Sequence, residues 1–152
     1  MTECRTCELT ERRDRGEAPD WDLIVRTADW DLVHAYDTSI EGWLVLVARR
    51  HVTAVADLTA DEALELGPMI RWVSLALAEV TGCEKTYVVQ FAEHPEHPHV
   101  HVHVIARPPD LAPELQGPGI FGALGVPEAE RVSEERMDEI ARAMRVAVAT
   151  HR

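Results

Sequence analysis

Short apolar runs dominate the first third of the chain, and their spacing is typical of β-strands. Three such runs cover residues 22–26, 30–36 and 42–49, and the last is the most apolar of them. β-Branched and aromatic side chains recur in these runs, which favours extended backbone. Together they predict an antiparallel meander. The preceding residues 1–20 are polar and mixed in charge, so we expect an extended lead-in there.

A helix is predicted after the third run. Thr59 and Glu62 have the spacing of a capping box, in which hydroxyl and carboxylate satisfy the first helical N–H groups. Apolar residues then recur at helical spacing to about residue 80, and Gly82 ends the helix. Pro68 lies inside this helix, where it removes a hydrogen bond and clashes with the preceding turn. We therefore expect a kink or a split at this point.

The remaining residues predict two more strands and a second helix. Residues 85–91 and 99–107 are the expected fourth and fifth strands, joined by a Pro-rich turn. Residues 110–131 contain four glycines and three prolines, which predicts a long irregular segment. Ser133 caps a final helix that runs from residue 134 to about residue 150.

Composition narrows the class of protein. The 152 residues suit a single domain spanning 1–152, and 15 Lys and Arg against 27 Asp and Glu give a net charge of −12. This charge argues against a protein that coats nucleic acid or an anionic membrane, because its field repels phosphate groups. A small phosphorylated ligand needs only a local site and is not excluded.

The chain also lacks the apolar segments of a membrane or secreted protein. No apolar run approaches the roughly 20 residues of a membrane span, and the N-terminal residues have no apolar signal segment. Three cysteines without an export signal indicate a reducing compartment. We expect a cytoplasmic enzyme or ligand-binding domain.

Histidines are concentrated in the fifth predicted strand, since five of the eight lie between residues 94 and 103. His99, His101 and His103 alternate with valines, so a strand places the imidazoles on one face and the valines toward the core. Imidazoles can bind a metal ion or hold a phosphate. Three of them along one flat strand converge poorly on a tetrahedral ion. A row of reactive imidazoles therefore fits better than a zinc site made of these three alone.

A second candidate for chemistry is the pair Cys4 and Cys7. A CxxC pair alone is compatible with metal binding, with redox chemistry and with no function. The redox interpretation requires a preceding strand and a helix that starts at the motif, and neither is evident in this segment. Zinc requires two further ligands, typically His or Cys. Two free surface thiols remain the alternative.

The chain resembles the histidine-triad (HIT) superfamily of nucleotide hydrolases and transferases in the run His99-Val-His101-Val-His103-Val-Ile. The order of the other elements is similar too, including the segments Gly42-Trp-Leu-Val-Leu-Val-Ala-Arg-Arg-His51 and Tyr87-Val-Val-Gln90. The likeness covers roughly residues 1–108. It implies an α+β fold with a five-stranded antiparallel sheet, one main helix and a C-terminal helix. It also implies a homodimer, with a HIT core over 21–108 between an N-terminal arm (1–20) and a C-terminal segment (109–152).

The resemblance implies a mechanism as well. His101 attacks the α-phosphorus of a purine nucleotide, and water hydrolyses the nucleotidyl-histidine that forms. His99 and His103 orient it and stabilise the developing charge. The implied substrates are dinucleoside polyphosphates or adenosine phosphoramidates. Gln90 and Asp37 stand where relatives contact phosphate and ribose.

Zinc ligands are suggested by the same resemblance. Several HIT relatives and the galactose-1-phosphate uridylyltransferases hold a structural zinc on a CxxC pair, on the His that ends the Arg-Arg-His segment and on the first triad His. In this chain these residues are Cys4, Cys7, His51 and His99. Zinc there ties the N-terminal arm to the third and fifth strands and contributes to folding.

Two departures from the family pattern bear on the activity. Trp43 replaces a fourth histidine that relatives usually carry, and we expect it to line the nucleotide pocket. The loop 91–98 is acidic and Pro-rich where relatives have Gly, Gln, Ser or Thr, and its Glu93 and Glu96 repel a polyphosphate. Its two histidines can supply donors instead. These departures leave two alternatives open: a non-catalytic nucleotide- or zinc-binding regulatory protein, and a nucleotidyltransferase.

Overall fold

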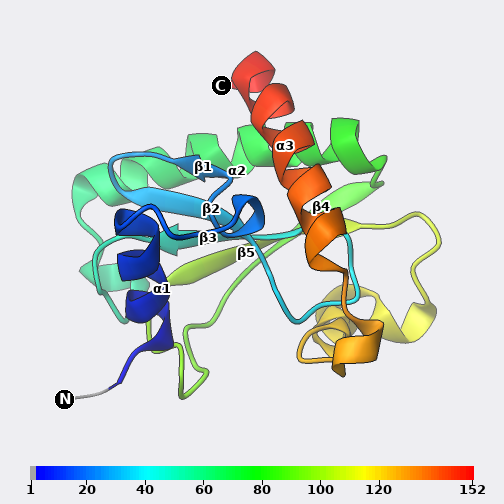
Figure 1. The fold of residues 1–152 in the computed structure, drawn as a ribbon, viewed down its shortest axis with the longest axis horizontal. Helices are drawn as coiled ribbons and strands as arrows, with labels where there is room; N and C mark the ends of the chain where they lie inside the picture. Colours follow the sequence, from blue (N-terminus) through cyan, green and yellow to red (C-terminus); the bar gives the residue numbers. More distant parts are fainter. Residues whose placement is uncertain (1–2) are drawn as a thin grey trace.

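A five-stranded antiparallel sheet forms the centre of the computed structural model, which describes residues 3–152 (Figure 1). The strands follow the order β1-β2-β3-β5-β4, so the first three form the expected meander. Their bounds are Val25–Arg26 (β1), Trp30–His34 (β2), Trp43–Ala48 (β3), Lys85–Gln90 (β4) and His101–Arg107 (β5). The predicted α+β class is therefore confirmed.

The two faces of the sheet have different neighbours. α2 (Ala60–Thr81) and α3 (Glu134–His151) pack on one face over a core that includes Val102 and Val104. The opposite face carries a smaller apolar cluster around Trp43 and Ile105, beside the 3-10 helix η4 (Gly117–Ala123). Figure 1 shows α2 and α3 on one side of the sheet, with α1 and the segment containing η4 at separate places on the other.

Helix α2 is continuous through Pro68, so the expected split is wrong. Thr59 and Glu62 form the predicted capping box, and Gly82 ends the helix in the left-handed conformation at φ 70°. Pro68 costs roughly 3 kcal/mol in a helix interior. The helix nevertheless continues because Met69, Trp72, Val73, Ala76 and Leu77 are buried in the core beneath it, and burial of Met69, Val73 or Leu77 alone is worth about 1.5–3 kcal/mol.

The N-terminal segment is a helix, α1 (Arg5–Asp14), which corrects the expectation of an extended lead-in. Residues 1–2 of the predicted arm lie outside the described residues. A buried ion pair holds the helix in place, with the Arg13 guanidinium donating to the Asp22 carboxylate at 2.8 Å and to its carbonyl oxygen at 2.7 Å. Arg12 donates to the same carboxylate. Asp22 lies beyond the end of the helix, so the polar pattern of residues 1–20 did not predict this pair.

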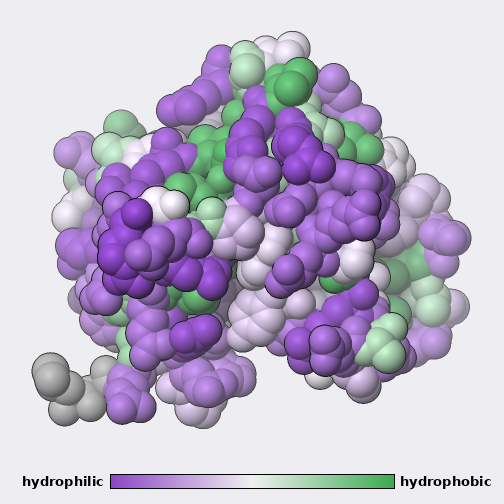
Figure 2. Space-filling model, in the orientation of Figure 1, coloured by the Kyte–Doolittle hydropathy of each residue, from purple (hydrophilic) through white to green (hydrophobic). Residues whose placement is uncertain are grey.

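The C-terminal third follows the sequence prediction closely. Residues 110–131 form three 3-10 helices with irregular connections, and the Ser133 side chain caps α3 by accepting from the Arg136 N–H. Within the part of the chain that the structure describes, no helix has the length and apolar character needed to cross a membrane. Hydrophilic side chains cover most of the face drawn in Figure 2.

Candidate functional site

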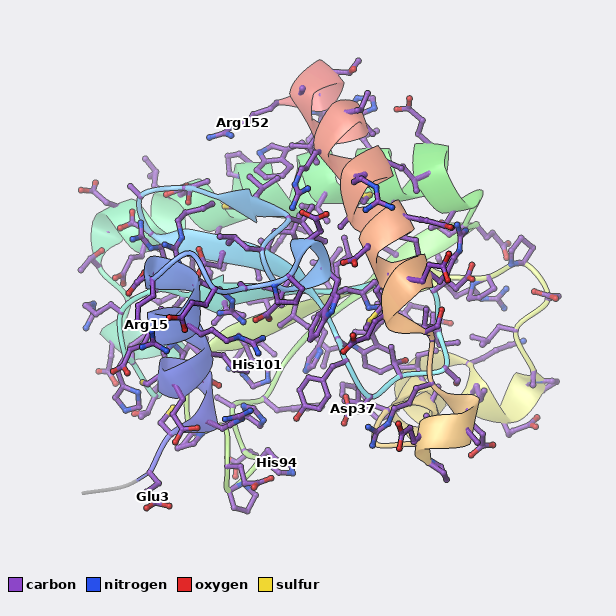
Figure 3. The ribbon with its side chains drawn as sticks, in the orientation of Figure 1. Glu3, Arg15, Asp37, His94, His101 and Arg152 are labelled. Carbon is purple, nitrogen blue, oxygen red and sulfur yellow. The ribbon has the colours of Figure 1, made fainter. Side chains whose placement is uncertain are left out.

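A cavity of about 680 Å³ lies on the sheet face that α2 and α3 leave free. Its floor is formed by β3 and β5, its walls by α1 and by η4, and its rim by the loop that contains Glu93–His97. Figure 3 shows His101, Asp37 and His94 facing this region from different segments of the chain, and all three line the cavity. The volume is in the range of pockets that hold small ligands.

His101 presents a free ring nitrogen to this cavity. Its Nδ1 lies 2.7 Å from the backbone oxygen of His99, and a carbonyl can only accept, so Nδ1 carries the proton. The lone pair of the neutral ring is therefore on Nε2. Burial lowers the pKa of His101 below its ordinary value, which keeps the ring neutral at pH 7. A neutral imidazole with an available lone pair is a competent nucleophile.

His103 lies next to His101 with ring centroids 5.0 Å apart. Strand β5 places His103 opposite Val45 and His101 opposite Val47, so both imidazoles share the cavity face while Val102 and Val104 face the core. This is the alternation that the sequence predicted. Burial lowers the pKa of His103 to about 3, so its ring is also neutral.

His99 departs from the predicted row. Strand β5 begins at His101, and His99 precedes it with a fully buried side chain that does not line the cavity. Its Nε2 is 2.6 Å from the Ala48 carbonyl oxygen. The expected fifth strand from residue 99 is thus two residues too long, because hydrogen bonding to the end of β3 directs this ring away from the cavity.

The three other predicted substrate contacts are placed differently from one another. Asp37 lines the cavity. Gln90 is half-buried at the end of β4, paired with Val102, and does not line the cavity. Trp43 is fully buried behind His103 and its indole does not line the cavity either.

One wall of the cavity was missed by the sequence analysis. Thr6 and Arg13 of α1 line it, and the Thr6 hydroxyl lies 2.8 Å from Nδ1 of His97 on the rim loop. The Arg5 N–H donates to the Glu96 carbonyl oxygen at 2.8 Å, which joins the same helix and loop. Thr6, Thr10 and Arg13 are four and three residues apart, which places them on one face of a helix, and all three are buried. This spacing was the feature of the sequence that could have predicted the wall.

A second constellation lies beside the cavity and brings together Cys4, Cys7, His51 and His99, with their ligand atoms within 4.8 Å of one another. The Cys7 sulfur is 3.2 Å from His51 Nδ1 and 3.6 Å from His99 Nδ1, and the Cys4 sulfur is 3.7 Å from His99 Nδ1. The two Nδ1 atoms are 3.2 Å apart. The four residues come from α1 and its N-cap, the end of β3 and the approach to β5.

These distances fit a tetrahedral metal ion. Zinc with bonds of about 2.05 Å to nitrogen and about 2.3 Å to sulfur gives edges of about 3.3 Å between two nitrogens and about 3.6 Å between nitrogen and sulfur. The tautomer of His99 fits as well: Nε2 donates to the Ala48 carbonyl, so Nδ1 points its lone pair into the cluster. The cluster can therefore hold a metal ion.

The fold and the site together define an α+β protein with a cavity on one sheet face, imidazoles on the cavity floor and, beside it, a Cys/His cluster that could hold a metal ion. The profile of the HIT domain matches residues 17–110, which is more than half of the chain. The chain belongs to the HIT domain family.

Several solved structures share this fold. A histidine triad (HIT) protein from Sinorhizobium meliloti is 27% identical, with 88% of this chain and 91% of that chain covered and a TM-score of 0.66. A histidine triad protein from Bradyrhizobium japonicum is 25% identical over 82% and 88% of the two chains, with a TM-score of 0.68. A Zn-bound histidine triad family protein from Mycobacterium smegmatis is 16% identical, covers 97% and 94%, and has a TM-score of 0.68. The search of the curated proteins found no match.

Proposed function

We propose that this protein is a nucleotide hydrolase that cleaves a purine nucleotide at its α-phosphorus through a nucleotidyl intermediate on His101. The observation that carries the proposal is the tautomer of His101, whose Nδ1–H is bound to the His99 carbonyl while Nε2 is free at the cavity floor. Membership in the HIT domain family supports the same chemistry.

The reaction divides into two displacements. The Nε2 lone pair of His101 forms a bond to the α-phosphorus as the bond to the leaving group breaks, and the leaving group departs with the electron pair and takes up a proton from solvent. The ring now carries a proton on Nδ1 and phosphorus on Nε2 and is positively charged, so its Nδ1–H bond to the His99 carbonyl strengthens. Water then attacks the phosphorus and releases a proton to solvent, the P–Nε2 bond breaks and returns its electron pair to the ring, and the nucleoside monophosphate leaves.

The charges around the cavity favour one class of leaving group. Asp37, Glu93 and Glu96 line it, whereas Arg13 is the single arginine or lysine among the described lining residues. The Arg13 guanidinium is already paired with the Asp22 carboxylate. Like charges at 4 Å cost about 1 kcal/mol in water and about 4 kcal/mol near a protein surface. A nucleoside phosphoramidate, which carries little charge beyond its α-phosphate, therefore fits better than a dinucleoside polyphosphate.

Covalent trapping tests the proposed function. Wild-type protein and His101→Ala are mixed with adenosine and guanosine phosphoramidates and with dinucleoside polyphosphates, quenched without acid, and examined by intact-protein mass spectrometry. We expect a nucleotidyl adduct on the wild type alone, and its mass identifies the base. Binding without adduct or product supports the regulatory alternative, and transfer of the nucleotidyl group to an acceptor other than water supports the transferase.

Neutralising the rim loop is expected to relax the substrate preference. In the double variant Glu93→Gln and Glu96→Gln, kcat/KM for a dinucleoside polyphosphate rises about 10-fold at low ionic strength, equivalent to roughly 1.4 kcal/mol of removed repulsion. The value for a phosphoramidate with a neutral amine stays within about 2-fold. The double variant Glu134→Gln and Glu135→Gln in the exposed first turn of α3 serves as a control with the same change in net charge. Equal effects on both substrates contradict the electrostatic explanation.

The Cys/His cluster is proposed to hold a structural zinc ion. All four positions are occupied by protein ligands, as in closed structural zinc sites. The ion neutralises the thiolates and joins α1 to the ends of two strands. The proposed nucleophile, His101, lies in the neighbouring cavity, so the ion has a structural role.

A further inference from the structure

The third imidazole of the motif is held by a single, directional hydrogen bond from Trp43. The indole Nε1–H donates to Nδ1 of His103 at 2.9 Å, and both side chains are buried. An indole N–H has no acceptor capacity, so the direction of this bond is fixed. Nδ1 of His103 must therefore be the unprotonated nitrogen, and the proton of the neutral ring lies on Nε2.

The surrounding packing keeps this arrangement in place. The rings of Trp43 and His103 are perpendicular with centroids 5.7 Å apart, and the Phe121 ring meets both edge-on, at 5.4 Å from Trp43 and 5.3 Å from His103. Trp43 pairs with Ile105 and Val45 pairs with His103, so Trp43 and His103 are diagonal neighbours on one sheet face. A ring flip of His103 breaks the indole bond inside this aromatic cluster.

The remaining ring nitrogen of His103 faces the cavity. The ring lines the cavity, and within residues 3–152 Nε2 has no hydrogen-bond partner and is not among the buried unsatisfied polar atoms. The neighbouring His101 presents the Nε2 lone pair. The cavity floor thus carries one acceptor nitrogen that can attack and one N–H that can donate to a phosphate oxygen.

We infer that Trp43 is a positioning residue, whose indole N–H sets the Nε2–H tautomer of His103 and so makes this imidazole a hydrogen-bond donor to the substrate phosphate. This inference rests on the proposed function for its kinetic consequence, but the tautomer itself is a property of the substrate-free protein. A histidine at position 43 can donate or accept, so it permits this tautomer without imposing it. The low pKa of His103, about 3, is consistent with a ring that stays neutral and donates.

The first test measures the tautomer directly. In wild-type protein with ¹⁵N-labelled histidine, NMR distinguishes a protonated from an unprotonated ring nitrogen, and His103→Gln assigns the signals. We expect a protonated Nε2 and an unprotonated Nδ1 for His103, and a mixture of tautomers in Trp43→Phe. A protonated Nδ1 in the wild type overturns the inference, whatever the protein's activity proves to be.

The second test separates positioning from packing. Trp43→Phe keeps an apolar ring without a donor, whereas Trp43→His restores an N–H in a less similar shape. We expect kcat to fall about 10-fold or more in Trp43→Phe with KM changed less, and to recover at least partly in Trp43→His. If Trp43 acts through packing alone, Trp43→Phe should have a higher kcat than Trp43→His. A higher kcat in Trp43→Phe overturns the inference. If wild type has no hydrolytic activity, the proposed function fails while the NMR result still decides the tautomer.

Discussion

Replacement of His101 with alanine is expected to lower kcat by about 10⁴-fold or more, because it removes the atom that forms the bond to phosphorus. The remaining groups of the cavity still bind substrate, so KM changes far less than kcat. The side chain is only partly buried and its Nδ1–H makes one part-buried hydrogen bond to a backbone carbonyl, so the free energy of unfolding changes by about 1–2 kcal/mol.

Product formation by chromatography and unfolding in urea measure these two effects separately. His151→Ala on α3 is the matched control, because it removes an imidazole that bonds only the Glu79 carboxylate, away from the cavity. That variant is expected to retain wild-type kcat. A His101→Ala protein that keeps more than about a tenth of wild-type kcat rules out the covalent mechanism and directs attention to another nucleophile or to a directly attacking water.

The position of His101 could be predicted because strand alternation is a local property. Val102 and Val104 require one face of β5 to be buried, which leaves His101 and His103 on the other. The cavity above that face could not be predicted in the same way. It depends on α1 and η4, which build the cavity walls from segments at opposite ends of the sequence.

His99 shows where the local argument stops. Alternation assigns it to the same row, but its ring instead contacts two segments distant in sequence, the end of β3 and the cysteines at the start of α1. Its proposed role as a metal ligand came from the family resemblance, and the geometry brings its Nδ1 to the three partner side chains. Helix α1 was missed for a similar reason. Its buried contacts with the rest of the protein are made by the Arg13–Asp22 ion pair and by the cysteines of the Cys/His cluster, so the sequence shows no apolar stripe at helical spacing.

The backbone of His99 also connects the two sites. Its side chain belongs to the Cys/His cluster, while its carbonyl oxygen accepts the Nδ1–H bond that fixes the tautomer of His101. A displacement of His99 therefore affects the nucleophile through one hydrogen bond. This hydrogen bond couples the Cys/His cluster to the imidazole that we propose as the nucleophile, two residues away.

Removal of the proposed zinc ion is expected to destabilise the protein by about 4 kcal/mol, the value for a ligand present at 1,000 times its dissociation constant. For a chain of this size, that corresponds to a fall in Tm of about 10 °C. The physical reason is that the ion joins residues near the start of α1 to the ends of β3 and β5, and without it the lone pairs of the ligand atoms face one another. α1 keeps its Arg13–Asp22 pair, so we expect its first turn to loosen most.

Thermal unfolding with and without a chelator, combined with native mass spectrometry, measures this effect. Wild type is expected to carry one zinc ion per chain and to lose stability on chelation, whereas Cys4→Ser and Cys7→Ser start at the lower Tm and do not respond. Cys83→Ser is the matched control, because this third cysteine lies beside Gly82 and outside the cluster. Hydrogen exchange should increase in α1 of the two cluster variants and remain unchanged in the control. If the wild type contains no metal and its Tm does not change with the chelator, the proposed zinc site is wrong. Cys4 and Cys7 are then ordinary thiols, and the Arg13–Asp22 pair alone stabilises α1.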